Sequence, residues 1–210
     1  LFAVHMLQHT LLGAIAPLLI LLGLTGPILR PLLASHRVRR LMFLTHPFVA
    51  FPLWCANLLV WHIPVVYDAA LANDALHAVE HGCVMGAGLL LWAPIVEPLP
   101  GPAWFGTRLK VAYMAGVWFV GLISANVFWF SGKVIYPHSI EPAPLFGVSA
   151  LQDQGDAGTV MMVTHCLLAF GAVAVLFFRQ GAEEQLRQRL LEAGIDPTRV
   201  ERAERTGHME

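Results

Sequence analysis

Charged residues are scarce in this sequence. Of its 210 residues, 57% are apolar and only 13% are charged, whereas about a quarter of the residues of an average soluble domain are charged. Thirteen of the 27 charged residues lie in 179–210, so only 14 remain for the preceding 178 positions. A segment so poor in charge cannot cover a surface that faces water. This excludes a soluble globule and a disordered chain, and it predicts a membrane protein.

The sequence also lacks a basic cluster, a signal peptide and paired cysteines. The formal net charge is −1 with scattered Lys and Arg, which argues against a nucleic-acid partner because such binding needs a concentrated basic face. Residues 1–24 have neither a positive start nor a small-residue cleavage site, so they predict a membrane span, and we expect a further segment to precede Leu1. No CxxC pair or disulfide framework is present; the cysteines lie singly, at Cys55, Cys83 and Cys166.

Apolar stretches long enough to cross a bilayer occur five times. A membrane-spanning helix needs about 20 mostly apolar residues. The predicted spans are 2–24, 41–61, 75–96, 109–130 and 157–178. The pattern therefore predicts an all-α fold, a polytopic transmembrane helix bundle with at least five spans, over residues 1–178. Residues 179–210 predict a cytoplasmic amphipathic helix followed by a polar tail.

Positive charge alternates between the loops. The first loop holds four arginines between residues 30 and 40, and the third holds Arg108 and Lys110. The second loop, 62–74, has no Lys or Arg, and the fourth, 131–156, has only Lys133. Because Lys and Arg favour the cytoplasmic side, we expect the first helix to begin outside and the C-terminus to be cytoplasmic. The fourth loop is unusually long, which is typical of a functional lid.

Under this topology most histidines fall at the outer ends of the spans. The outer ones are His5, His9, His62, His77, His81, His138 and His165; the cytoplasmic ones are His36, His46 and His208. Sulfur-bearing side chains favour the same side, at Met6, Met85, Met161, Met162, Cys83 and Cys166. Polar side chains are costly inside a membrane, so their presence there indicates function. We therefore expect one outward-facing site.

The spacing of these residues is typical of metal ligands. His5 and His9 are four residues apart, as are His77 and His81, so each pair shares one helix face. Met161 and His165 have the same spacing. Imidazole suits copper, zinc and iron, while a thioether selects copper(I). The mixture of imidazole and thioether therefore favours copper over zinc.

The predicted metal ligands are His5, His9, His77, His81, His165, Met161, Met6 and His62. Four further residues are expected to support these ligands by hydrogen bonding: Glu80, Asp74, Gln8 and Asp153. Ordinary structural roles stay open. A single histidine such as His62 is usually hydrogen-bonded in a core, methionines are common core fillers, and Asp153 suits a solvated loop end or helix N-cap. No catalytic residue is predicted.

The order of these motifs resembles a known family. The motifs are His5-Met6-Leu7-Gln8-His9, Trp61-His62-Ile63-Pro64, His77-Ala78-Val79-Glu80-His81, and Asp153-Gln154 ahead of Gly158. Over nearly all of residues 1–178, the chain resembles the CtaG family of multi-span proteins required for assembling caa-type cytochrome c oxidase. The resemblance implies a non-enzymatic protein of the bacterial cytoplasmic membrane that supplies copper to the oxidase from the periplasmic or exterior side. Its implied partners are oxidase subunits and periplasmic copper chaperones.

Two other functions stay open. The segment His77-x-x-Glu80-His81 matches the H-x-x-E-H pattern of a class of zinc enzymes, in which Glu is the general base; this would make the chain an intramembrane zinc metalloenzyme. Alternatively, one histidine from each of two helices, such as His9 with His81 or His165, could hold haem b. Haem ligation does not explain histidine pairs flanked by methionine, so copper remains the preferred prediction.

Overall fold

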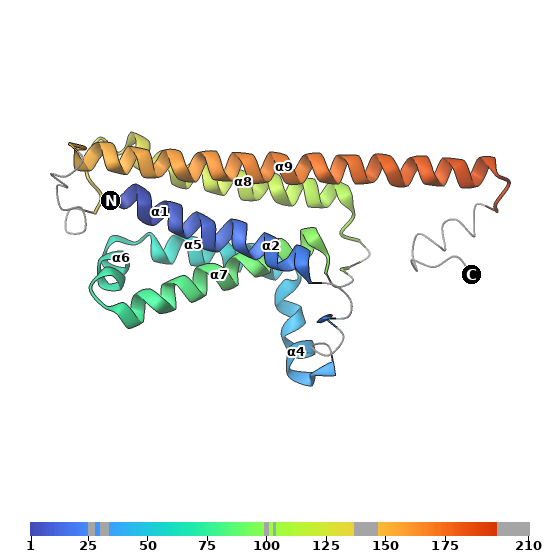
Figure 1. The fold of residues 1–210 in the computed structure, drawn as a ribbon, viewed down its shortest axis with the longest axis horizontal. Helices are drawn as coiled ribbons and strands as arrows, with labels where there is room; N and C mark the ends of the chain where they lie inside the picture. Colours follow the sequence, from blue (N-terminus) through green and yellow to red (C-terminus); the bar gives the residue numbers. More distant parts are fainter. Residues whose placement is uncertain (25–27, 30–33, 99–100, 103, 137–146, 197–210) are drawn as a thin grey trace.

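The computed structural model describes residues 1–24, 28–29, 34–98, 101–102, 104–136 and 147–196. These residues form helices joined by turns and loops, and no strand occurs among them. The helices pack side by side as a bundle (Figure 1). The all-α prediction is therefore confirmed.

The first predicted span is one continuous helical segment with an irregular centre. It consists of α1 (Phe2–Thr10), a π-helical turn (Leu11–Ile15) and α2 (Ala16–Gly23). Pro17 has no backbone N–H, so the carbonyl of Gly13 cannot receive the usual hydrogen bond from the residue four positions later. Single π turns of this kind occur often at functional sites. The irregular turn directly follows the face of α1 that carries His5 and His9.

The second predicted span, 41–61, differs most from the structure. Here α4 (His36–Leu41) and a 3-10 turn (Met42–Thr45) precede α5 (Pro47–Trp61), and α6 (Pro64–Leu71) follows after a bend of 73°. A residue before proline is disfavoured in helical geometry, and both His46 and Ile63 are extended. Pro47 therefore starts a new helix inside the predicted span, and Pro64 starts another in the predicted second loop, 62–74.

The remaining predicted spans correspond to three long helices. They are α7 (Asp74–Val96), α8 (Thr107–Phe130) and α9 (Ala150–Glu192). Asn73 starts α7 by accepting hydrogen bonds from the N–H groups of Ala75 and Leu76. Counting the first segment, four helices within the described residues are long and apolar enough to cross a membrane, or up to five if the bent α5–α6 pair is one span.

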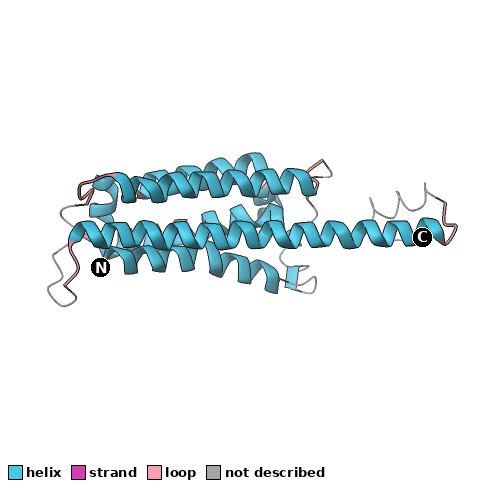
Figure 2. Cartoon of the chain, turned by 90° about the horizontal axis from the view of Figure 1, so that it is seen from above, coloured by secondary structure: helices cyan, strands magenta, loops and turns pink. Residues whose placement is uncertain are grey.

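α9 extends past both ends of the predicted span 157–178. It begins at Ala150, where Ser149 accepts a hydrogen bond from the N–H of Gln152, and it continues without a break to Glu192. The expected amphipathic helix after residue 178 is thus the end of the same helix, up to Glu192, and the predicted polar tail beyond residue 196 lies outside the described residues. Figure 2 shows α9 projecting well beyond the bundle. The expected lid, 131–156, is shortened because its last residues belong to α9, and residues 137–146 of it also lie outside the described ranges.

The helices expose much apolar surface. Large apolar side chains that face outward include Leu19, Leu22, Phe119, Ile123, Leu167, Phe170 and Phe177. Such surface would be unfavourable in water, but it is compatible with lipid, where helices satisfy their own backbone polar groups. The fold is that of a polytopic membrane protein.

The bundle has two distinct ends. We call the end at which α1, α7 and α9 begin the proximal end; α6 and the end of α8 lie there too (Figure 1). α4 and the end of α2 lie at the opposite, distal end (Figure 1). This arrangement agrees with the alternation that the loop charges predict, while the direction of the bundle in the membrane stays a prediction.

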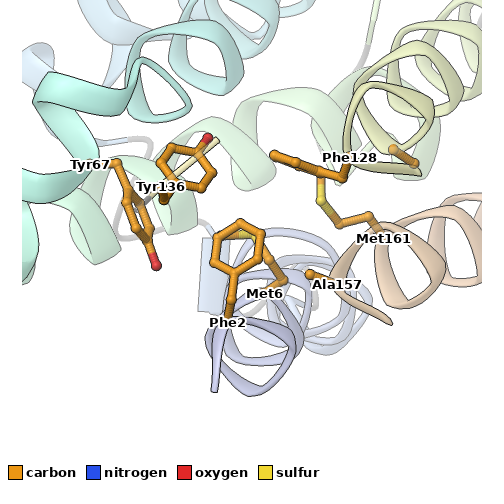
Figure 3. Close-up of a cluster of buried hydrophobic side chains, with 8 residues drawn as sticks. Phe2, Met6, Tyr67, Phe128, Tyr136, Ala157 and Met161 are labelled. Carbon is orange, nitrogen blue, oxygen red and sulfur yellow. The ribbon is translucent and has the colours of Figure 1, made fainter. Parts of the chain in front are cut away.

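Buried apolar side chains join four helices at the proximal end (Figure 3). The cluster consists of Phe2, Met6, Tyr67, Ala125, Phe128, Tyr136, Ala157 and Met161. The ring of Phe2 meets Tyr67 and Phe128 edge-on, with centroids 5.6 and 5.4 Å apart, which is a favourable aromatic geometry. The cluster thereby fixes the beginning of α1 against α6, α8 and α9.

Candidate metal centre

Two facing helices bring four histidines together at the proximal end. On α1 the rings of His5 and His9 have centroids 4.2 Å apart, and on α7 those of His77 and His81 are 4.3 Å apart. Across the helices, His5 stacks on His77 with centroids 5.4 Å apart. The rings of His9 and His81 meet edge-on at 5.1 Å. The two pairs that the sequence placed on separate helix faces therefore face each other.

A close approach of the helices makes this arrangement possible. A Cβ atom built on Gly88 of α7 would lie 2.0 Å from the carbonyl oxygen of Gly13. Only glycine therefore permits α7 to pass this close to the π-helical turn. Since the crossing lies less than two helical turns beyond His9 and His81, it sets how near the histidine pairs come.

Glu80 belongs to the same group. One ligand atom from each of His5, His9, His77 and Glu80 lies within 4.8 Å of the others. Two ligands of one ion lie up to about 4.4 Å apart when each is 2.0–2.2 Å from the metal. Small side-chain movements would therefore let these four residues share one ion, and we call them, together with His81, the His/Glu site.

The polar atoms of the His/Glu site lack partners. The Nε2 atoms of His5, His9, His77 and His81 and both carboxylate oxygens of Glu80 are buried without a hydrogen bond to any described residue. His9 Nε2 lies 3.7 Å from Glu80 Oε1, which is too long for a hydrogen bond. A buried polar group left unsatisfied costs about 1–3 kcal/mol. Six such atoms at one place fit a site that a cation completes.

A cavity lies beside the His/Glu site. It has a volume of about 70 Å³ and lies between α1, α5 and α9. The residues with metal-binding side chains that line it are Met6, His9, His62, Met161 and His165. Of the three imidazoles among them, only that of His9 belongs to the group around Glu80. The eight predicted ligands thus lie in two adjoining places that share His9, and their binding of metal stays a prediction.

The comparison with known families agrees with this architecture. The family described as cytochrome c oxidase caa3 assembly factor matches residues 1–182. The chain belongs to this family. No curated protein and no solved structure matches it. The match covers every residue of the two places and confirms the resemblance that the motifs indicate.

In this assembly factor, Asp153 and Gln154 fasten the proximal end. Asp153 is buried, and its carboxylate accepts hydrogen bonds from the N–H groups of Phe2 and Ala3 at 2.6 and 3.0 Å. Gln154, which is fully buried, accepts the N–H of Ile135 and donates to the carbonyl of Phe128. Asp153 is therefore neither a solvated loop end nor the N-cap of its own helix, because it caps α1.

Tyr136 holds the segment after α8 to the break between α5 and α6. Its hydroxyl donates to the carbonyl of His62 at 2.9 Å. Burial raises the pKa of Tyr136, so the phenol keeps the proton that this hydrogen bond requires. His62 is thereby tied to the same packed end as α1.

The other residues singled out from the sequence lie elsewhere. Gln8 is exposed on α1, and Asp74 is the exposed first residue of α7. Glu80 accepts no hydrogen bond from a histidine in the described part of the chain, where orientation of an imidazole was expected. His36 is exposed and His46 packs against Phe48 and Trp104, both at the distal end. His138 and His208 lie outside the described residues.

The remaining sulfur-bearing residues do not line the cavity. Cys83 is exposed, and Cys166 accepts a hydrogen bond from the indole of Trp118. Met85 and Met162 are part-buried. The part-buried positions of the two methionines agree with the packing role that was left open for methionines.

Three residues that line the cavity or contact His165 were not predicted from the sequence. Trp54 and Asn57 line the cavity, and Gly121 of α8 lies against the ring of His165, where a Cβ would be 2.4 Å away. Asn57 is a polar residue within a predicted span, which is a recognisable signal. No comparable signal marks Trp54 or Gly121, since only the packing of helices reveals their position.

Proposed function

We propose that this assembly factor binds a copper ion at the His/Glu site and supplies it to cytochrome c oxidase during assembly. The ligands are drawn from His5, His9, His77 and His81, with Glu80 as an anionic ligand. The observation that carries the proposal is the convergence of three imidazoles with Glu80, next to the ring of His81, where the four Nε2 atoms and both carboxylate oxygens are buried without a hydrogen bond among the described residues. Metal binding removes the cost of leaving these atoms unsatisfied.

Copper is favoured over the other metals for two reasons. Imidazole binds copper, zinc and iron alike, but the adjoining thioethers of Met6 and Met161 favour copper(I). Cytochrome c oxidases also contain copper centres, so copper is the metal that an assembly factor of this family would handle. The role is non-catalytic, because the copper is cargo and leaves with the oxidase.

The packing of the rings disfavours haem. In five of the six pairs that the four histidine rings form, the centroids lie between 4.2 and 6.3 Å apart. A planar macrocycle ligated by two of these rings would have to displace the other two. The zinc-enzyme alternative uses the same residues, His77, Glu80 and His81, and metal analysis separates it from the copper proposal.

The proposed protein lies in the bacterial cytoplasmic membrane with its proximal end facing the periplasm or exterior. This orientation follows from the positive loops at the distal end. It places the His/Glu site where periplasmic copper chaperones can deliver the ion. The proximal end then also faces the oxidase subunits that receive copper.

Metal analysis of the purified protein tests the proposal. We expect the detergent-solubilised chain to bind copper, His77→Ala and His81→Ala to lose copper from this site, and His46→Ala at the distal end to bind like the unaltered chain. Full copper at the His/Glu site in His77→Ala would overturn the ligand assignment. Zinc retained in place of copper would support the enzyme alternative, and a Soret band would support haem.

A deletion strain tests the role in assembly. Grown with limiting copper, it is expected to make the oxidase subunits but to leave the oxidase deficient in copper and activity. The unaltered gene and the His46→Ala gene should restore both, and the His77→Ala gene should restore neither. Normal copper content in the oxidase of the deletion strain would refute the assembly role.

A further inference from the structure

The cavity beside the His/Glu site has its own, different set of metal-binding side chains. Two are imidazoles, His62 from the break between α5 and α6 and His165 from α9. Two are thioethers, Met6 from α1 and Met161 from α9. None of the described residues that line the cavity carries a carboxylate. The surroundings are therefore neutral, whereas the His/Glu site contains Glu80.

Backbone hydrogen bonds prepare both imidazoles for metal binding. Nδ1 of His62 lies 2.7 Å from the carbonyl oxygen of Leu58, and Nδ1 of His165 lies 2.7 Å from that of Met161. A carbonyl can only accept, so each Nδ1 must carry the proton. Each Nε2 is then unprotonated, which is the form that binds a metal, and this fixing of the ring by a carbonyl is common at metal sites. Nε2 of His62 is buried without a hydrogen-bond partner in the described ranges.

Neighbouring residues hold these side chains in place. The carbonyl of His62 is bound by the hydroxyl of Tyr136 at 2.9 Å. His165 is confined by Gly121 on one side and by Trp54, whose ring centroid is 6.2 Å away. Met6 and Met161 are nearly fully buried and also belong to the proximal apolar cluster (Figure 3). The imidazoles therefore line the cavity from fixed positions.

His9 connects the two places. Its ligand atom belongs to the group with His5, His77 and Glu80, and its side chain also lines the cavity. An ion held by His9 at the His/Glu site is therefore already bound by a residue of the cavity. Movement of that ion into the cavity would need only the exchange of its ligands other than His9.

We propose that the cavity is a second metal site, selective for copper(I), which receives the ion from the His/Glu site through their shared ligand His9. Thioether and imidazole ligands without a carboxylate favour the singly charged, soft ion. The transfer is a ligand exchange in which copper remains copper(I) throughout, so no electron or proton is consumed. The inference rests on the proposed function for the His/Glu site. It adds that one chain binds two copper(I) ions.

Copper(I) titration of the purified full chain tests the second site. With a chromophoric copper(I) chelator as competitor, we expect two bound ions in the unaltered protein. His77→Ala and the double variant Met6→Leu with Met161→Leu should each retain one, and the neighbouring change Met162→Leu should retain two. X-ray absorption of the copper(I)-loaded protein should show sulfur ligands, which the Met6→Leu, Met161→Leu variant loses. Leucine preserves the apolar packing, and circular dichroism with membrane abundance checks folding.

The outcomes separate the two proposals. One copper(I) ion per chain, lost in His77→Ala but retained with no sulfur ligand after the methionine changes, would overturn the second site and leave the His/Glu site standing. In that case Met6 and Met161 are packing residues. One ion with sulfur ligands, lost after the methionine changes but retained in His77→Ala, would overturn both the two-site inference and the ligand set of the proposed function. No copper binding would overturn both as well.

Discussion

Asp153 of α9 caps the first helix, which lies far from it in the sequence. Its Oδ2 accepts the N–H of Phe2 at 2.6 Å, although the two residues are 151 positions apart. Free N–H groups at a helix start are satisfied by an acceptor, and a negative charge there also interacts favourably with the helix dipole. This contact fixes the beginning of α1, one turn before His5. It therefore links the packing of α9 to the position of the His/Glu site.

Asp153→Asn is expected to weaken both stability and metal binding. The amide replaces a charged acceptor by a neutral one, and hydrogen bonds to charged groups contribute about 1.5–3 kcal/mol. We expect part of this loss in the free energy of unfolding, together with weaker copper affinity because α1 is less firmly held. Asp156→Asn, an exposed carboxylate on the same helix, is the matched control. Thermal unfolding in detergent measures the stability, and copper titration measures the affinity. Equal effects of Asp153→Asn and Asp156→Asn would contradict the capping role.

Gly121→Ala is expected to displace His165. The new Cβ would lie 2.4 Å from the ring, and overpacking of this kind costs about 1–3 kcal/mol. The variant should lose the sulfur-ligated copper(I) while the His/Glu site still binds. Gly116→Ala on the same helix places its Cβ 3.4 Å from Phe51 and should bind both ions. Unchanged copper(I) stoichiometry in Gly121→Ala would show that His165 does not ligate.

Gly88→Ala is expected to impair folding more than Gly121→Ala does. Its Cβ would meet backbone, the carbonyl oxygen of Gly13 at 2.0 Å, so α7 and the first segment must separate. We expect little folded protein in the membrane and no copper at the His/Glu site. Gly86→Ala, with nothing within 4 Å of its Cβ, should be tolerated or slightly stabilising, because alanine favours a helix over glycine by about 1 kcal/mol. Comparable membrane levels of the two variants would contradict the close crossing.

Copper is expected to raise the thermal stability of the protein. A ligand that binds only the folded state stabilises it by about 2.7 kcal/mol at a hundredfold excess over its dissociation constant. We expect the melting temperature to rise with copper and fall again when a chelator removes it. The rise should be smaller in His77→Ala and unchanged in His46→Ala. An identical rise in the His77→Ala protein would place the stabilising copper elsewhere.

The orientation of the bundle is testable by cysteine labelling. Ser35 precedes α4 at the distal end, and Ala72 lies in the exposed turn between α6 and α7 at the proximal end. With the three native cysteines replaced, an impermeant thiol reagent should label Ala72→Cys in intact cells and Ser35→Cys only after the membrane is opened. The reverse pattern would invert the protein and place the His/Glu site on the cytoplasmic side.

The sequence alone was sufficient for the class of fold and for the histidine pairs. A span is recognised by its length and apolar composition, and residues four apart share a helix face whatever the helix packs against. For this reason three predicted spans match α7, α8 and the first segment closely. The error at 41–61 is that one span was predicted from residue 41, whereas the structure begins a new helix at Pro47.

Only the tertiary structure decided which helix faces meet. Helical periodicity cannot show that Glu80 lies among the imidazoles of α1, that Asp153 caps Phe2, or that His165 lies beside Gly121. These relationships depend on the glycine-mediated crossing of α7 with the first segment and on the packing of α9 against α1 and α8. They divide the eight predicted ligands into two adjoining sets, because His9 belongs to the group with His77 and Glu80 and also lines the cavity with Met161 and His165.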